Sequence, residues 1–336
     1  MARRRKAKFF ADGFLLINKP AGPTSHDVVA RLRGRFKPAK IGHAGTLDPF
    51  ASGLLILAFN RATRLIDLLG QGSKTYRAVI GLGKATDTGD PTGEVISETP
   101  VPQLDEERIK ELLARMVGER MQAPPAYSAA KHEGKPLYAY ARKGIKIEKP
   151  PKRIEIYSAG LLNLEHNELR FEISCSRGTY IRPLGEELAR DLGAVGHLTS
   201  LVRTGSTPFG LDQACDLDRA VSLTEEELLG EMLKTSEALE QLGIANVVLD
   251  EDSAWELRQG RILSRDLFLA GSQGKIAGKG EPFMVHDPQG ELVAVLRWLG
   301  PCDARPGREY ETIRVFPDNQ AKDPAAQGKI PLLHVE

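Results

Sequence analysis

Apolar and polar positions near the start of the chain predict a strand, a turn and a helix in succession. Residues 14–18, FLLIN, form an apolar run of strand length, and the breakers within KPAGP at residues 19–23 end it. Ser25 is a suitable N-cap for the stretch HDVVARLRGRF at residues 26–36, whose apolar positions recur at helical spacing. The polar positions of this helix are basic.

The segments that follow alternate between strand, helix and turn patterns. In chain order we expect a strand at 53–59, a helix at 62–71, a strand at 74–83, a turn-rich loop at 86–95, a helix at 106–119, a pair of strands within 153–176 and a helix at 179–193. This mixture of single strands and helices is followed by a change of texture. From about residue 243 short strand patterns are separated by Gly and Pro turns, which predicts a small β-rich domain.

Residues 121–151, MQAPPAYSAAKHEGKPLYAYARKGIKIEKPP, predict an excursion from the core because prolines and glycines interrupt every regular pattern. Its cations are interleaved with aromatic residues, a chemistry that suits an RNA stem or loop, although a solvated amphipathic helix is an alternative. The candidate RNA contacts are Lys131, His132, Lys135, Tyr138, Tyr140, Arg142 and Lys143.

A chain of 336 residues exceeds the usual size of one domain, so we predict a larger and a smaller one. The predicted organisation is a basic N-terminal arm at 1–12, a large domain at 13–242 that carries the 121–151 insertion, a small β-rich domain at 243–317 and a tail at 318–336.

Composition leaves the function open but argues against several classes. Hydrophobic residues make up 41% and charged residues 27%, which is ordinary for a soluble globular protein, and no apolar run reaches the roughly 20 residues of a membrane span. The start MARRRKAKFF lacks the apolar core of a secretory signal, so we expect a cytoplasmic protein. Three cysteines and seven histidines lack metal-ligand spacing, so we predict no metal site.

Charge distribution is more informative than the net charge of +1. Basic residues cluster at 3–8 and again at 31–40, close to the most distinctive motif of the chain. Such clusters bind phosphates in some proteins and are solvated surface in most, so alone they do not establish RNA binding.

The distinctive motif is GHAGTLDPFASGLL at residues 42–55, a Gly-rich loop that leads into an apolar strand. An isolated aspartate before a proline, such as Asp48, is most often a turn or helix cap. In this context, however, the fourteen residues resemble the signature of the TruB family of pseudouridine synthases, in which this aspartate is the nucleophile. The resemblance therefore implies that Asp48 is catalytic.

Five further segments are similar to the family's motifs and occur in the same order. They are LLINKPAGPTSHD, KTYRAVIGLGKATDTGDPTG, PPAYSAAKHEGKPLYAYARKG, CSRGTYIRPLGEELARDLG and GHLTSLVRTGSTPF, and together with the Asp48 motif they cover roughly residues 13–211. Chance agreement of so many ordered blocks is negligible.

The reaction that this resemblance implies fits the residues. Uridine becomes its C-linked isomer when the N-glycosidic bond breaks, the base turns over and C5 joins the same sugar carbon. No electrons or groups are exchanged, so no cofactor is required, and the chain has no nucleotide-binding glycine fingerprint. A carboxylate such as Asp48 is needed in a water-excluding site, either to attack the sugar carbon or to abstract a proton and form a glycal.

The resemblance also implies roles for other residues. Tyr76 is expected to stack on the flipped base and to take part in proton steps, whereas a tyrosine on a half-buried strand is otherwise ordinary. Arg182 is expected to pair with Asp48, lower the pKa of that carboxyl and fix its rotamer. Tyr180 either hydrogen-bonds the base or Asp48, or packs in the wall of the site.

Residues near these motifs are expected to bind the substrate. His43 is expected to touch the RNA loop and help to open it, although an isolated loop histidine is more often structural. Lys19, Pro20 and Leu198 are expected to shape the pocket.

Asp87 and Asp90, within TDTGDPTG, form a carboxylate pair that could suggest calcium. Their turn-forming neighbours favour loop hydrogen bonding instead.

The resemblance implies an α+β catalytic domain with a mixed, largely antiparallel sheet and a cleft across its face. Residues 249–263 and 280–298 are similar to PUA or PUA-like modules, which implies an RNA-binding or stabilising role for the domain at 243–317. The implied activity is isomerisation of uridine 55 in the TΨC stem-loop of tRNA by a monomer without a guide RNA. The alternatives are a guide-dependent subunit and an RNA-binding or tRNA-folding protein in which catalysis is secondary.

Overall fold

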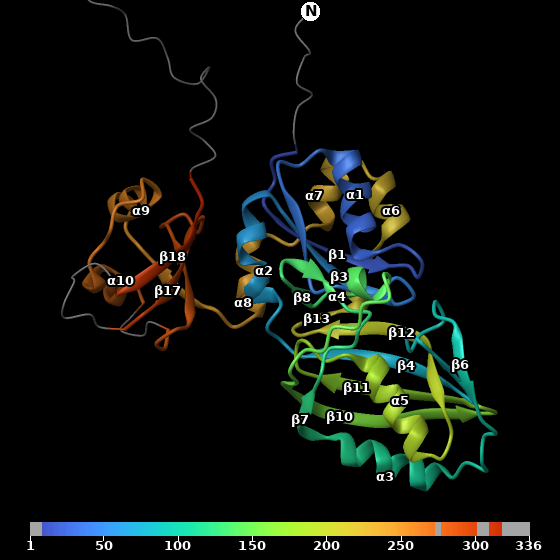
Figure 1. Cartoon of the computed structure of the whole chain (residues 1–336). Helices are drawn as coiled ribbons and strands as arrows, with labels where there is room; N and C mark the ends of the chain where they lie inside the picture. The colour runs from blue at the N-terminus through green and yellow to red at the C-terminus, as the bar shows by residue number, and fades with distance from the viewer. Residues whose placement is uncertain (1–8, 273–276, 301–308, 318–336) are drawn as a thin grey trace, which may run out of the picture. The chain divides into compact units, whose positions relative to one another are not determined.

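The computed structural model describes residues 9–272, 277–300 and 309–317, and the chain divides into two compact units between Lys234 and Thr235 (Figure 1). Most of the expected basic arm, residues 1–8, and the expected tail at 318–336 lie outside the described residues. The expected boundary at residue 242 falls after helix α8 (Thr235–Gln241), which belongs to the second unit.

The first unit is built on a ten-stranded mixed sheet in the order β14-β1-β3-β12-β4-β11-β10-β7, with β2 paired to β3 and β13 paired to β12. Its strands are β1 (Gly13–Lys19), β2 (Ile41–Ala44), β3 (Ser52–Phe59), β4 (Lys74–Leu82), β7 (Gly118–Gln122), β10 (Lys152–Glu165), β11 (Glu168–Cys175), β12 (Gly196–Ser206), β13 (Phe209–Gly210) and β14 (Cys215–Asp216). The β1–β14 and β3–β12 pairs are parallel and the other pairs are antiparallel. The expectation of a mixed, largely antiparallel sheet in an α+β fold is confirmed.

The helices of this unit are short. They are α1 (Ser25–Phe36), α2 (Ile66–Leu69), α3 (Glu106–Met116), α4 (Leu137–Ala141), α5 (Ile181–Asp191), α6 (Leu217–Ser222) and α7 (Glu225–Glu231), with 3₁₀ turns at Asn60–Leu65 and Leu211–Gln213. The prediction that Ser25 caps α1 is wrong by one residue. Thr24 is the N-cap and forms a capping box with Asp27, whereas Ser25 is fully buried beneath the loop that precedes Asp48.

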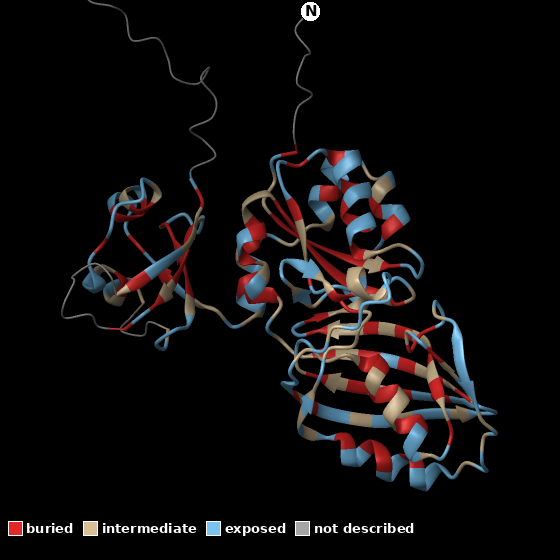
Figure 2. Ribbon diagram, in the orientation of Figure 1, coloured by how far each residue is buried: buried red, intermediate tan, exposed pale blue. Residues whose placement is uncertain are grey.

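Helices α3 and α5 contribute the apolar face that covers the sheet (Figure 2). In α3 the buried positions Ile109, Leu112, Leu113 and Met116 follow helical spacing, and the helix begins at Asp105, whose side chain accepts a hydrogen bond from Glu107 N. Each such buried side chain stabilises the fold by about 1.5–3 kcal/mol.

The 121–151 insertion is not a featureless loop. It contains the end of β7, a two-stranded ribbon formed by β8 (Lys131–His132) and β9 (Lys135–Pro136), and helix α4. A second small ribbon, β5 (Lys84–Thr86) with β6 (Val95–Glu98), encloses the turn-rich loop.

The second unit has its own sheet and core. The sheet order is β15 (Ala245–Val248), β16 (Pro282–His286), β17 (Leu292–Trp298) and β18 (Tyr310–Val315), accompanied by α9 (Glu251–Arg258) and α10 (Arg265–Gly271). Phe268 packs its ring against Phe283 and Tyr310, with ring centroids 5.7 and 5.0 Å apart. The predicted short strands of a small β-rich domain are confirmed. Among the described residues, no helix is long and apolar enough to cross a membrane.

Candidate active site

Asp48 lies on the loop between β2 and β3, and an earlier segment of the chain holds the backbone of this loop. Leu47 N donates to Ser25 Oγ at 2.9 Å, and the same hydroxyl lies 3.2 Å from Leu47 O. Gly22 N donates to Pro49 O at 2.8 Å. Hydrogen bonds from residues 22–25 therefore hold the backbone on both sides of Asp48.

Lys19 stabilises the same loop through hydrogen bonds to backbone carbonyls. Its side chain is fully buried, and Nζ donates to the carbonyls of Pro20 at 2.9 Å, Pro23 at 2.8 Å and Pro49 at 3.4 Å. Burial lowers the pKa of Lys19 to about 8, while the nearby Asp48 carboxylate opposes this shift. Lys19 and Pro20 thus support the loop from behind and do not line the cavity.

Arg182, in the first turn of α5, brings several segments together around Asp48. Its side chain is only 4% exposed, and Nε lies 3.0 Å from Asp48 Oδ2. Nη1 donates to Thr88 O at 2.6 Å and Nη2 donates to Tyr127 O at 2.5 Å, while Nη1 also lies 3.4 Å from Asp90 Oδ2. The predicted contact between Asp48 and Arg182 is present, and the guanidinium also holds two loops in place.

The pKa of Asp48 is set by opposing effects. Burial is the largest and raises the pKa above its ordinary value, whereas the Arg182 guanidinium lowers it, Asp90 raises it and Lys19 lowers it. Arg182 therefore acts in the expected direction, but the net shift is upward because desolvation outweighs the ion pair. A carboxylate in this setting is a stronger base and nucleophile than one in water.

Asp90 is the second carboxylate beside Arg182, a position that the sequence did not predict. Its Oδ1 accepts hydrogen bonds from Thr88 Oγ1 at 2.9 Å and Thr92 N at 3.0 Å. Asp87 Oδ1 accepts from Glu94 N at 2.9 Å within the loop, and its Oδ2 accepts from Tyr127 Oη at 3.0 Å. Both aspartates therefore make the loop hydrogen bonds expected from their turn-forming neighbours, and Asp90 in addition faces the arginine.

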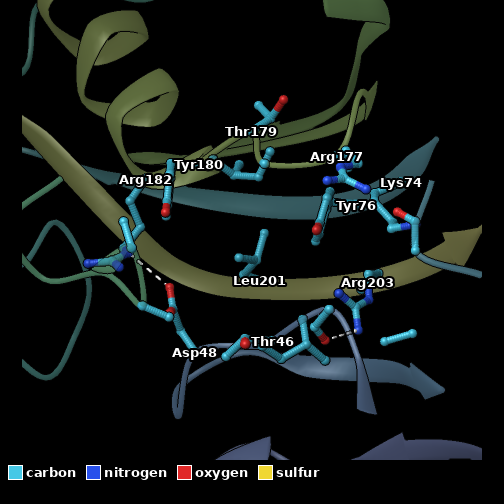
Figure 3. Close-up of a pocket in the computed structure, with 18 of the residues that line it drawn as sticks. Thr46, Asp48, Lys74, Tyr76, Arg177, Thr179, Tyr180, Arg182, Leu201 and Arg203 are labelled. Carbon is cyan, nitrogen blue, oxygen red and sulfur yellow. Dashed lines mark hydrogen bonds and ion pairs between the residues drawn. The ribbon is translucent and has the colours of Figure 1, made fainter. Parts of the chain in front are cut away.

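A cavity of about 450 Å³ opens beside Asp48 (Figure 3). Asp48, Tyr180 and Arg182 lie on one side of the view, and Lys74, Tyr76, Arg177 and Arg203 lie on the other, with Leu201 between the two groups. The cavity has the size of a small-molecule site, and both apolar side chains and a large share of charged and polar side chains line it. These properties suit a single base removed from an RNA stack.

Tyr76 is placed by the register of the sheet. It lies on β4 directly opposite Arg203 of β12, and the residue is only 9% exposed. Burial raises the pKa of Tyr76, while the charge and hydrogen bond of Arg203 lower it; the net shift is upward. The phenol is therefore neutral at physiological pH, which favours stacking and hydrogen bonding over action as a phenolate base.

Tyr180 and the insertion form the opposite wall. Tyr180 N donates to Gln122 Oε1 at 2.8 Å, and Gln122 Nε2 donates back to Tyr180 O at 2.9 Å. The insertion lines the cavity through Ala129 and Ala130. The candidate RNA contacts Lys131, His132 and Arg142 lie farther along the insertion and do not line the cavity.

His43, on β2, also lies outside the cavity lining. Its ring packs edge-on against His26, with centroids 5.3 Å apart, and burial followed by the charge of His26 lowers its pKa. Among the described residues its buried Nδ1 has no hydrogen-bond partner. The lowered pKa keeps the histidine neutral at physiological pH.

The expectation that Leu198 shapes the pocket is wrong. Leu198 is fully buried beneath α5, where a Cβ on Gly185 would lie 2.8 Å from its Cδ2. A bulge in β12 between Leu198 and Ser200 leaves Leu201, opposite Ala78, on the same face as Leu198, opposite Ile80. Leu201 lines the cavity, whereas α5 covers Leu198.

Four cations of the cavity were not predicted from the sequence, namely Lys74, Lys152, Arg177 and Arg203. Lys74 lies two residues before Tyr76 on one strand, so strand periodicity could have placed both on the same face. Arg203 carries no such signal because its position depends on the bulge. Within residues 9–272, 277–300 and 309–317, no group of three His, Cys, Asp or Glu side chains could hold a metal ion.

Comparison with known proteins identifies the family. Residues 33–181 match the model of the TruB family pseudouridylate synthase (N terminal domain). A protein named tRNA pseudouridine synthase B from Bordetella avium is 43% identical over 227 residues, which cover 67% of this chain and 92% of that protein. The chain belongs to the TruB family.

Other TruB relatives match over most of their length. A tRNA pseudouridine synthase B from Geobacter sulfurreducens is 42% identical over 306 residues, 91% of this chain and 99% of that protein. A chain in the crystal structure of a Cbf5–Nop10–Gar1 complex superposes with a TM-score of 0.68 at 24% identity, covering 91% of this chain and 85% of that one. This likeness supports the pseudouridine synthase fold of the chain.

Proposed function

We propose that this TruB family enzyme isomerises uridine 55 in the TΨC loop of tRNA to pseudouridine, without a guide RNA. The observation that carries the proposal is the 3.0 Å contact between Asp48 and Arg182 in a cavity that Tyr76 lines. The relatives named tRNA pseudouridine synthase B support tRNA as the substrate.

In the proposed reaction the uridine leaves the RNA stack and enters the cavity, where Tyr76 holds the face of the base. Asp48 acts on the sugar as a carboxylate while Arg182 fixes its rotamer. The N1–C1′ bond breaks, the base turns over and C5 bonds to C1′. The proton lost from C5 is balanced by protonation of N1, so the product is an isomer.

The surrounding residues are proposed to bind the RNA. His43 and Tyr180 contact the target loop, and Lys131, His132 and Arg142 of the insertion contact the stem-loop backbone. The second unit is proposed to be a PUA-like module that binds tRNA away from the cavity. We propose that the enzyme acts as a monomer in the cytoplasm, where tRNA is modified.

The test is the purified chain with an unmodified TΨC stem-loop transcript and no other component. We expect pseudouridine at position 55, and we expect Asp48→Asn to abolish it while tRNA affinity stays within a few-fold. Activity that appears only with a guide RNA or partner proteins would overturn the guide-independent function. Full activity of Asp48→Asn would overturn the role of the carboxylate.

A further inference from the structure

The cavity contains buried positive charge that the ion pair of Asp48 and Arg182 does not use. Lys74 is 5% exposed and Arg203 is 2% exposed, and both line the cavity. Among the described side chains, neither has a carboxylate within ion-pair distance. Taking a cation out of water without a counter-ion costs free energy, so this arrangement calls for a functional explanation.

Backbone carbonyls hold these two cations in place and leave donors available. Lys74 Nζ donates to Gly70 O at 3.3 Å and Gly72 O at 2.9 Å, although an ammonium group has three N–H donors. Arg203 Nε donates to Leu54 O at 2.7 Å, Nη2 donates to Gly45 O at 3.2 Å, and the guanidinium also hydrogen-bonds Tyr76, although it has five N–H donors.

Lys19 provides the contrast within the same site. It is also fully buried, but three carbonyls accept from its ammonium group and it does not line the cavity. Its charge supports a loop. Lys74 and Arg203 differ because each faces the cavity with unused donors.

The sheet register places this charge beside the base-holding tyrosine. Lys74 and Tyr76 share one face of β4, and Arg203 lies opposite Tyr76 on β12. In Figure 3 these three residues lie together, away from Asp48 and Arg182. The cavity thus has one part suited to the sugar and another suited to the base.

We propose that Lys74 and Arg203 form a site that stabilises the negative charge of the detached uracil. This inference rests on the proposed function. When the N1–C1′ bond breaks, its electron pair stays on N1, and the base is an anion until C5 uses an electron pair to bond to C1′. Preorganised donors aimed at a developing anion in a desolvated cavity stabilise the transition state more than the substrate.

An RNA phosphate is the other anion that these cations could bind. The structure favours the detached base because Lys74 and Arg203 are buried next to Tyr76, whereas the exposed Arg177 and Lys152 at the same cavity are more accessible to a backbone phosphate. A contact with an RNA phosphate would contribute to affinity for the RNA, while a contact with the detached uracil anion would contribute to the rate.

The first test is Lys74→Met, measured by single-turnover kinetics on the stem-loop and by RNA binding at several salt concentrations. We expect kcat to fall by about 100-fold, as for loss of one donor to an oxyanion, with Kd and its salt dependence unchanged. Lys84→Met, at an exposed lysine of β5 outside the cavity, is the matched control.

The second test is Lys74→Arg, which keeps the charge and remains informative if Lys74→Met does not fold. Burial, the neighbouring Arg203 and Arg177 lower the pKa of Lys74 to about 8, while Cys175 opposes them. In the wild type, kcat should fall as the pH rises through about 8, because Lys74 loses its proton. Lys74→Arg should keep most of the activity and lose this alkaline decline, since arginine stays protonated.

Each outcome distinguishes this inference from the proposed function. If the wild type converts no uridine, the proposed function fails. If the wild type is active but Lys74→Met keeps its kcat, or Lys74→Arg keeps the alkaline decline, the anion site is refuted. A weaker Kd with a smaller salt dependence and unchanged kcat would instead assign Lys74 to an RNA phosphate.

Discussion

At the scale of single residues, the charge of Asp48 depends on a balance between desolvation and Arg182. Burial raises the pKa of the carboxyl and the guanidinium lowers it. Because the net shift is upward, Asp48 becomes protonated at a higher pH than an ordinary aspartate. A reaction that needs the ionised carboxylate must therefore slow as the pH falls through this raised pKa.

Arg182→Met tests this balance. Removing the guanidinium removes the effect that lowers the pKa of Asp48, so the acid side of the pH–rate profile should move to higher pH. We also expect kcat to fall by about 100-fold because the Asp48 rotamer is no longer fixed. Single-turnover rates between pH 5 and 9 measure both effects. The control is Arg190→Met, at an exposed arginine of the same helix. An unchanged acid limb would mean that Arg182 does not set the charge of Asp48.

Prediction from sequence succeeded for residues that belong to a recognisable motif. It failed for residues whose role depends on contacts that form only in the folded protein. Asp48 and Arg182 were expected together and lie 3.0 Å apart, although 133 residues lie between them in the sequence. The upward pKa of Asp48 was not expected, because burial cannot be read from a motif. Leu198 was assigned to the pocket wrongly because α5 packs over it, a contact that the sequence pattern of β12 does not show.

At the scale of elements, the parallel contact between β3 and β12 positions the Asp48 loop beside the rest of the site. The two strands pair at Ser52 with Val202 and at Gly53 with Arg203. Gly53 has φ +100, and a Cβ there would lie 2.3 Å from Arg203 O and 2.8 Å from Arg203 N. The glycine of the ASGLL segment is therefore required for close approach of two backbones.

Gly53→Ala should destabilise the protein by about 3 kcal/mol, since backbone strain and a backbone clash act together. Gly118→Ala, at φ +112 with open space around the added methyl, isolates the strain and should cost about 1–2 kcal/mol. Gly230→Ala, in helix α7 with open space, should be neutral or slightly stabilising. Urea unfolding measures all three, and equal effects of Gly53→Ala and Gly118→Ala would contradict the close approach.

Periodicity predicted most elements of the fold but not their arrangement. The strand at 74–83 and the helix at 106–119 appear as β4 and α3 within a few residues, because their apolar positions face one core. The order β1-β3-β12-β4 joins strands far apart in the chain, and local patterns carry no information about such pairing. The insertion looked irregular because its ribbon and helix are too short to produce a periodic pattern.

At the scale of the whole molecule, the residues of the cavity belong to the first unit, and each unit has a separate apolar core. The boundary between Lys234 and Thr235 has a structural reason. Leu233 exchanges two backbone hydrogen bonds with Phe14 at 2.9 and 2.8 Å, so the segment up to Leu233 extends the fold of the first unit. The sequence texture changes only later, near residue 243, because α8 resembles the helices that precede it.

A chain truncated after Lys234 tests the division of labour between the units. Because every cavity residue remains, we expect kcat on the isolated TΨC stem-loop to stay within about three-fold of that of the full chain. Affinity for whole tRNA should fall if the second unit binds a part of the tRNA outside this stem-loop. A shorter truncation after Glu231 removes the Phe14–Leu233 pairing and should lower the melting temperature of the first unit. Filter binding with both RNAs separates the two contributions. Equal losses on the stem-loop and on whole tRNA would show that the second unit serves the catalytic unit itself, through its stability or its site, and would refute an independent RNA-binding role.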